Sequence, residues 1–424
     1  MSNLLAWIDD RFPLTKVWRE HLSEYYAPRN FNFWYFFGSL ALLVLVIQIV
    51  SGIFLTMHYK PDASLNAAGV PVAFASVEYI MRDVPWGWLI RYIHSTGSSA
   101  FFIVVYLHMY RGLLYGSYRG PRELLWLIGV VIFVALMAEA FMGYLLPWGN
   151  MSYWGAQVII SLFDAIPWIG PALSEWIRGD FVVADATLNR FFAFHVIAVP
   201  LILVMLVFLH IVALHKVGSN NPDGIEIKKK KGPDGTPLDG IPFHPYYTVK
   251  DIVATVVFLI LFAAVIFFSP ELGGWFLEHD NFVQASALST PTEIVPLWYF
   301  TPFYSILRAN IYNFLWIDAK IWGVFFMFLS IAMFAFLPWL DRSPVKSIRY
   351  RGWMYKTALA IFVVSFIVLG YLGTKNPEQV DLILLPNVHW AGICTLTYFL
   401  FFFLMPIYTR LDKTRPVPER VTSK

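Results

Sequence analysis

The chain is poor in charge and almost free of cysteine. Only 14% of its 424 residues are charged, 58% are hydrophobic, and Cys394 is the single cysteine. One cysteine excludes an internal disulfide framework, a cysteine-ligated iron–sulfur cluster and a C-x-x-C-H motif for covalent cofactor attachment, so any such centre would have to lie on a partner. The formal net charge of +3 gives no indication of nucleic-acid binding.

The chain contains many long apolar runs. Runs long enough to cross a bilayer, about 20 residues each, recur along it, which predicts an all-α polytopic protein embedded in lipid. The charged N-terminal segment, with Asp9, Asp10 and Arg11, does not resemble a signal peptide, so we expect none. The eight expected spans are residues 33–57, 88–112, 124–146, 189–214, 249–269, 316–340, 354–373 and 389–409.

Basic residues predict the orientation of the spans. Cytoplasmic connections of membrane proteins carry an excess of Lys and Arg, and alternate connections of this chain do so together with both of its ends. We therefore expect both termini to be cytoplasmic. The four consecutive lysines at residues 228–231 are then an anchor on the inside, in a flexible loop.

Two pairs of histidines lie within apolar spans. His94 and His108 are fourteen residues apart in the second span, and His195 and His210 are fifteen apart in the fourth. These spacings are close to four helical turns, so each helix presents both imidazoles on roughly one face, about 21 Å apart along its axis. Two such helices packed together would give two facing histidine pairs at two membrane depths.

The paired histidines favour a cofactor over simple packing. A polar ring in hydrocarbon is costly and usually has a task, although four independent packing histidines are the alternative. Neutral imidazole is a good iron ligand, so the pairs predict two non-covalent b-type haems, each iron held by two histidines. With both axial positions filled, such haems would carry electrons rather than activate oxygen.

Glycines and arginines accompany the histidines. Small residues let membrane helices pack closely, but two glycine pairs with the histidine period favour clearance for flat macrocycles. Two arginines lie three residues from a histidine, where each could pair with a haem propionate or snorkel to the membrane surface. The residues are Gly38 and Gly52 in the first span, Gly129 and Gly143 in the third, and Arg91 and Arg111 in the second.

Seven segments form a more specific pattern. They are R-Y-I-H (91–94), G-Y-L-L-P-W-G (143–149), M-S-Y-W-G-A (151–156), A-T-L-N-R-F-F-A-F-H (186–195), H-K-V-G-S-N-N-P (215–222), F-H-P-Y-Y-T-V-K-D (243–251) and P-L-W-Y-F-T-P-F-Y-S-I-L-R (296–308). Together they resemble the cytochrome b family, the membrane core of quinol:cytochrome c oxidoreductases, over nearly the whole chain.

The resemblance implies an architecture and partners. It implies a di-haem four-helix domain over residues 1–222, a basic cytoplasmic loop over 223–242 and a second four-helix domain over 243–424. It also implies a homodimeric complex in a bacterial inner membrane, with a Rieske iron–sulfur protein and a membrane-anchored c-type cytochrome. The substrate would be ubiquinol, with ubiquinone as its oxidised form.

The resemblance also assigns the haem ligands. It implies that His94 and His195 hold the outer haem, and that His108 and His210 hold the inner one. The unsplit chain is typical of the respiratory type, whereas the fifteen-residue spacing in the fourth span is similar to the photosynthetic type. One more residue adds about 1.5 Å of rise, which extra tilt or a bulge near Pro200 can absorb. We therefore expect unusual helix geometry there and unchanged ligands.

An outer quinol pocket follows from the resemblance, although one of its usual residues is missing. The family's usual second residue of the P-L-W-Y segment is a glutamate, and here it is Leu297. We expect Glu293 in the same loop to substitute, because a loop acid can reach bulk water, with the intramembrane Glu139 as the alternative. By itself, the segment could be an interfacial anchor. The implied pocket residues are Tyr144, Gly155, Ile159, Pro296, Trp298 and Tyr304.

An inner quinone pocket is implied by four further residues. His215 and Asp251 can deliver protons to the two quinone oxygens, and Lys250 can replenish them from the cytoplasm. Lys250 alone could equally be a polar residue at the membrane edge. Ser219 completes the set.

These features predict the core subunit of a ubiquinol:cytochrome c oxidoreductase. Quinol oxidised outside would send one electron to the Rieske protein and the other inward across both haems to quinone, so that protons are translocated by the Q cycle. The alternatives are a simple di-haem anchor passing electrons between quinone and a dehydrogenase, and a transporter that uses intramembrane histidines. The P-L-W-Y segment and the second helical domain argue against the anchor.

Overall fold

The computed structural model describes residues 2–313 and 315–422, and that part of the chain is mostly helical. Strands β1 (Tyr26–Pro28) and β2 (Gly240–Pro242) pair antiparallel. The α-helices are α1 (Ser2–Asp9), α2 (Leu14–Trp18), α3 (Phe36–Thr56), α4 (Val72–Arg82), α5 (Gly87–Tyr115), α6 (Glu123–Leu145), α7 (Asn150–Phe163), α8 (Gly170–Arg178), α9 (Asp185–Ala193), α10 (Val199–Val217), α11 (Tyr246–Phe268), α12 (Thr301–Arg308), α13 (Ala319–Leu340), α14 (Trp353–Leu372), α15 (Asn387–Phe403) and α16 (Met405–Leu411). Short helical turns are η1 (Arg19–Ser23), η2 (Phe33–Tyr35), η3 (Phe194–Ala198), η4 (Ile227–Lys229), η5 (Leu272–Gly274) and η6 (His279–Phe282).

The long helices agree with the eight expected spans. Within the described residues, six helical segments are long and apolar enough to cross a membrane, and α15 with α16, bent by 60°, makes a seventh when counted as one span. The remaining expected span is α5, which is 29 residues long but carries arginines, histidines and small polar residues among its apolar ones. The chain is therefore a multi-pass membrane protein.

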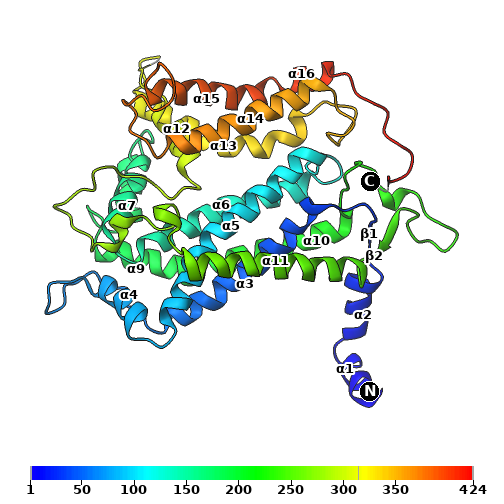
Figure 1. Cartoon of the computed structure of the whole chain (residues 1–424), viewed down its shortest axis with the longest axis horizontal. Coiled ribbons are helices and arrows are strands. Elements are labelled where there is room, and N and C mark those ends of the chain that lie inside the picture. The colour runs from blue at the N-terminus through cyan, green and yellow to red at the C-terminus, as the bar shows by residue number, and fades with distance from the viewer. Residues whose placement is uncertain (1, 314, 423–424) are drawn as a thin grey trace.

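The spans form two groups that run broadly along the long axis of the molecule (Figure 1). In one group α3 packs along α5, and α6 packs along α10, while α12 to α15 pack with one another in the other group. α11 lies against α3 and α5, although the sequence-based division assigns it to the second domain; that division stays a prediction. Both chain ends lie toward the same end of the molecule (Figure 1), as an even number of spans requires.

The fourth span contains a π-helical turn. After α9 the chain passes through η3, which is π-helical and includes His195, before α10 begins with Pro200 in its first turn. A π-helical turn accommodates one more residue than an α-helical one. It therefore absorbs the extra residue between His195 and His210, and the bulge expected near Pro200 is confirmed.

The loop after α10 is held by ion pairs near both of its ends, and the expected flexibility of the segment between them stays a prediction. Glu226 Oε1 lies 2.6 Å from Arg122 Nη1 and 2.6 Å from Lys346 Nζ. Near the other end, Arg420 Nε lies 2.9 Å from Asp239 Oδ2. These partners are more than 100 residues away in sequence, so the composition of the loop gave no sign of them.

Candidate functional site

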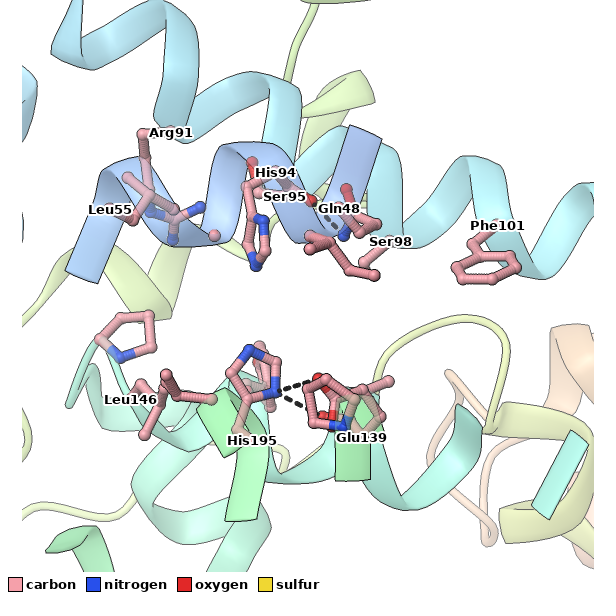
Figure 2. A pocket seen from close by; sticks show the side chains of 18 of the residues that line it. Gln48, Leu55, Arg91, His94, Ser95, Ser98, Phe101, Glu139, Leu146 and His195 are labelled. Atoms are coloured by element: carbon pink, nitrogen blue, oxygen red, sulfur yellow. Dashed lines mark hydrogen bonds and ion pairs between the residues drawn. The ribbon is translucent and has the colours of Figure 1, made fainter. Parts of the chain in front are cut away.

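His94 of α5 and His195 of η3 point toward one another across a cavity (Figure 2). Their ring centroids are 6.1 Å apart and the rings are perpendicular. The cavity has a volume of about 230 Å³ and is lined mainly by apolar side chains. Helix packing therefore brings together His94 and His195, the two histidines that the family resemblance pairs.

Hydrogen bonds fix the orientation of both rings. His195 Nδ1 lies 3.0 Å from the backbone oxygen of Glu139 and 3.0 Å from its Oε1. His94 Nδ1 lies 3.0 Å from Ser51 Oγ, and that hydroxyl donates its own proton to the Ile47 carbonyl, so it accepts from His94. With the proton on Nδ1, the Nε2 atom of each ring carries the lone pair that can bind a metal.

His108 of α5 and His210 of α10 form a second facing pair. Their centroids are 6.4 Å apart and their planes are inclined at 62°. Both histidines of α5 therefore face the fourth span, at two levels about 21 Å apart along an α-helix. This is the arrangement that the spacing predicted.

Each of the four period-matched glycines lies against the ring of one histidine. At three of them an added Cβ would lie 3.1 to 3.3 Å from the imidazole Cε1, and at the fourth, Gly143, it would overlap the ring. These glycines therefore give room to the imidazole rings, and clearance for flat macrocycles stays a prediction. The contacts pair Gly38 with His108, Gly52 with His94, Gly129 with His210 and Gly143 with His195.

The two arginines that flank the α5 histidines have different surroundings. Arg91 lines the cavity close to His94 (Figure 2). The Arg111 guanidinium lies 5.0 Å from the ring centroid of Tyr35, and its buried Nε has no hydrogen-bond partner among the described residues. A buried unpaired donor costs free energy, so the Arg111 position suits an acidic group supplied from outside the chain.

The same cavity reaches the loop before α12. Tyr144, at the end of α6, lines the cavity together with Leu297 and Tyr299. Tyr299 is only 1% exposed; its ring stacks on Phe102 at 3.8 Å, and its carbonyl accepts a 2.6 Å hydrogen bond from the Tyr106 hydroxyl. The P-L-W-Y segment is thus fixed against α5.

The residues implied for the outer pocket contact several different parts of the chain. Tyr144 and Gly155 adjoin one another, since a Cβ on Gly155 would lie 3.9 Å from the Tyr144 ring. Trp298 Nε1 donates to Ser99 Oγ at 3.0 Å, and the Tyr304 hydroxyl donates to a backbone carbonyl ten residues earlier. The last two hydrogen bonds hold the segment in place. Partly exposed positions are occupied by Ile159 and Pro296.

Three acids are candidates for the proton acceptor of the outer pocket. Glu139 is engaged with His195, and Glu293 is exposed. Glu278, which was not among the residues expected from the sequence, accepts a 2.7 Å hydrogen bond from the Tyr144 hydroxyl. Burial raises the pKa of the Glu278 carboxyl to about 7, although the hydrogen bond from Tyr144 acts in the opposite direction. The only signal in the sequence was an acid that follows two apolar loop residues.

The implied inner residues gather around the N-terminal segment. The His215 ring stacks on Tyr25 at 4.5 Å, and Ser219 Oγ lies 3.4 Å from the Tyr25 hydroxyl. His21 Nδ1 lies 3.2 Å from His215 Nδ1. His21 and Tyr25 were not expected from the sequence, because nothing local to them indicates contact with the end of α10.

Lys250 and Asp251 lie at the start of α11. The Lys250 ammonium lies 5.1 Å from the ring centroid of Tyr247, and Asp251 is partly exposed. Phe243 connects this group to the previous one, because its ring centroid lies 6.2 Å from that of Tyr25 and 6.0 Å from that of Tyr247. A row of aromatic rings therefore joins the two halves of the implied pocket.

Two levels of facing histidines inside a bundle of spanning helices define a membrane electron-transfer protein. The family model described as cytochrome b/b6/petB matches residues 22–218, and the model described as cytochrome b (C-terminal)/b6/petD matches residues 284–399. The chain therefore belongs to the cytochrome b family of bc complexes, which binds haem and forms part of an oxidoreductase.

Individual relatives agree along nearly the whole chain. A cytochrome b of Allochromatium vinosum is 62% identical over 427 residues, covering 99% of this chain and 98% of the relative. A cytochrome b of Rickettsia prowazekii is 47% identical over 420 residues, covering 99% and 97%. The structure is similar to a chain of a hyperthermophilic respiratory complex III, with a TM-score of 0.84 and 37% identity, covering 96% of this chain and 99% of that one.

Proposed function

We propose that this chain binds two haems and, within a bc complex, oxidises quinol near the outer face of the membrane and reduces quinone near the inner face. The observation that carries the proposal is the pair of facing histidine levels, of which the outer one shares a cavity with Tyr144 and Leu297. Electron transfer across the membrane needs both levels, and quinol oxidation needs a pocket that opens onto the outer one.

The histidine pairs fit haem iron. Two imidazoles that bind one metal ion from opposite sides at about 2 Å each have centroids about 6 Å apart, and the observed separations are 6.1 and 6.4 Å. The unpaired Arg111 Nε suits a haem propionate. When bound, the haems supply reversible one-electron transfer at two depths.

The residues of the chain give direction to this transfer. Quinol at the outer pocket loses two electrons and two protons; one electron leaves for a Rieske iron–sulfur protein and the other moves inward, from the level of His94 to that of His108. At the inner pocket His215 and Asp251 donate protons to the quinone oxygens, and Lys250 replenishes them. Proton uptake inside and release outside make the cycle proton-translocating.

The remaining proposals concern the membrane, the substrate and the partner subunits. Because positively charged connections stay in the cytoplasm, the end with both termini faces the cytoplasm of a bacterial inner membrane. The substrate is ubiquinol, and the assembly is a homodimeric complex that includes a membrane-anchored c-type cytochrome. Cys394 is the single cysteine of the chain, so the iron–sulfur cluster has its ligands on the partner.

The test is whether quinol oxidation is bifurcated. Quinol is added to the purified complex in two experiments, one with the c-type cytochrome reduced beforehand and one with it oxidised. Reduction of the b-type haems is followed in both by their absorption bands. We expect oxidation of the c-type cytochrome to increase reduction of the b-type bands, because the two electrons of quinol must leave together by two routes. If reduction of the b-type bands does not depend on the high-potential acceptor, the chain is a simple di-haem anchor.

A further inference from the structure

Tyr144 and Glu278 form a hydrogen-bonded pair at the wall of the outer cavity. Tyr144 lines the cavity, and its hydroxyl donates to Glu278 Oε2 at 2.7 Å. Phe276 and Leu277, the two residues before Glu278, are buried and line the cavity as well. The carboxylate therefore lies one hydrogen bond behind the cavity surface.

The residue that replaces the family's glutamate lines the same cavity. Leu297 is only 5% exposed and packs in an apolar cluster with Tyr299 and Phe303. Its hydrocarbon side chain cannot accept a proton, yet quinol must release two protons when it is oxidised. A carboxylate on another segment of the cavity wall can take over this task without any change at Leu297.

We propose that Glu278 is the proton acceptor of the outer quinol pocket and that Tyr144 relays the proton to it. The inference rests on the function proposed above. One quinol hydroxyl gives its proton to the Tyr144 oxygen while the proton of the Tyr144 hydroxyl moves to the Glu278 carboxylate, which becomes a neutral carboxylic acid. The two electrons would leave quinol separately, one for an iron–sulfur cluster on the partner and one for a haem held by this chain.

The position of Glu278 gives the proton a way out. The residues that follow it, His279 and Asp280, are exposed and titratable. A proton on Glu278 can therefore pass to the outer aqueous phase, after which the second quinol proton follows the same route. Glu293 is also exposed, but the Tyr144 hydroxyl donates to Glu278, and the geometry favours Glu278 over the acid expected from the sequence.

The charge state of Glu278 suits this role. With its pKa raised by burial to about 7, the carboxyl takes up and releases a proton readily near neutral pH, where a general base is most effective. The titratable groups that face it are Tyr144 from α6 and Tyr299 from the P-L-W-Y segment. His279 and Asp280 follow Glu278 in the loop and are exposed. Because the ionised form accepts the proton, turnover should rise as pH increases through about 7.

The experiment uses the assembled complex and compares Glu278→Gln and Tyr144→Phe with wild type. Quinol:cytochrome c turnover is measured from about pH 5.5 to about pH 9, and haem content is determined in each preparation. We expect both variants to lose at least about tenfold in turnover, and Glu278→Gln to lose the rise through pH 7, with haem content unchanged. Adding Leu297→Glu to Glu278→Gln should restore part of the turnover. Glu175→Gln, an exposed acid on α8, is the control and should match wild type.

The outcomes separate this inference from the function on which it rests. A Glu278→Gln complex with wild-type turnover and pH profile would overturn the role of Glu278, and a loss confined to Glu293→Gln would assign the role to Glu293. If Glu278→Gln assembles without its haems, Tyr144→Phe decides, because an unchanged turnover there refutes the relay. A wild-type complex that does not oxidise quinol refutes the proposed function itself.

Discussion

Gly143 lies so close to His195 that a methyl group at Gly143 would overlap the imidazole ring. Hydrogen bonds from His195 Nδ1 to Glu139 hold the ring in that position. On the other side of the cavity the matching contact is looser, because a Cβ on Gly52 would lie 3.2 Å from Cε1 of His94. A methyl group at Gly143 should therefore disturb the outer histidine pair more than a methyl group at Gly52.

This inequality predicts an order of effects. Gly143→Ala should displace His195 and shift the absorption band and midpoint potential of the outer haem, or abolish its binding, whereas Gly52→Ala should have a smaller effect; overpacking of this kind costs about 1–3 kcal/mol. Gly392→Ala on α15, where the nearest atom lies 4.0 Å from the added Cβ, is the matched control. Reduced-minus-oxidised spectra and redox titrations give the measurement. An unaltered outer haem in Gly143→Ala would show that the contact is unimportant.

Removal of one histidine should remove one haem. His94→Ala and His195→Ala should each lose the outer haem, and His108→Ala and His210→Ala the inner one, because each substitution would remove one of the two imidazoles proposed to hold that haem iron. His389→Ala, at an exposed position on α15, should keep both. Pyridine-haemochrome quantification checks this prediction, and two haems per chain in His195→Ala would contradict the assignment.

Substitutions at the inner pocket should act on one half-reaction only. His215→Ala and Asp251→Asn should slow reoxidation of the inner haem by quinone about tenfold or more, because proton donors are lost there, while quinol outside still reduces that haem. Stopped-flow traces resolve the two phases. The assignment fails if inner-haem reduction itself disappears while haem content stays intact.

The ion pairs of Glu226 should contribute stability that depends on pH. Burial alone would raise the pKa of Glu226, but hydrogen bonds and charges from Arg122 and Lys346 outweigh it and hold the pKa below its ordinary value of 4.5. A carboxyl with a lowered pKa in the folded state stabilises the fold above its unfolded pKa, and this contribution is lost as pH falls through the folded pKa.

Glu226→Gln should therefore lower the free energy of unfolding by about 3 kcal/mol at neutral pH, because Arg122, only 2% exposed, would lose its counter-charge. The difference from wild type should shrink as pH falls below 4.5, the ordinary pKa of this carboxyl. Denaturant unfolding of the purified protein in detergent provides the measurement, with the exposed Glu378→Gln as control. A difference that does not change with pH would mean that the charge of Glu226 is not the cause.

The sequence by itself determined the features that repeat along one helix. Apolar length predicted the spans, and the spacings of His94 with His108 and of His195 with His210 predicted two levels, because helical periodicity converts residue number directly into direction and height. Even the irregular turn near Pro200 followed from one surplus residue, and the structure has it as η3.

Only the tertiary structure decided which residues meet across segments. Tyr144 and Glu278 are 134 residues apart, and His21 and His215 are 194 apart. No local pattern encodes such contacts, since they depend on how whole helices and loops pack. From the sequence, Glu293 was therefore expected as the proton acceptor because of its loop position. Packing instead brings the Glu278 carboxylate to the Tyr144 hydroxyl, because burying a carboxyl is favourable only where a hydrogen-bond donor meets it.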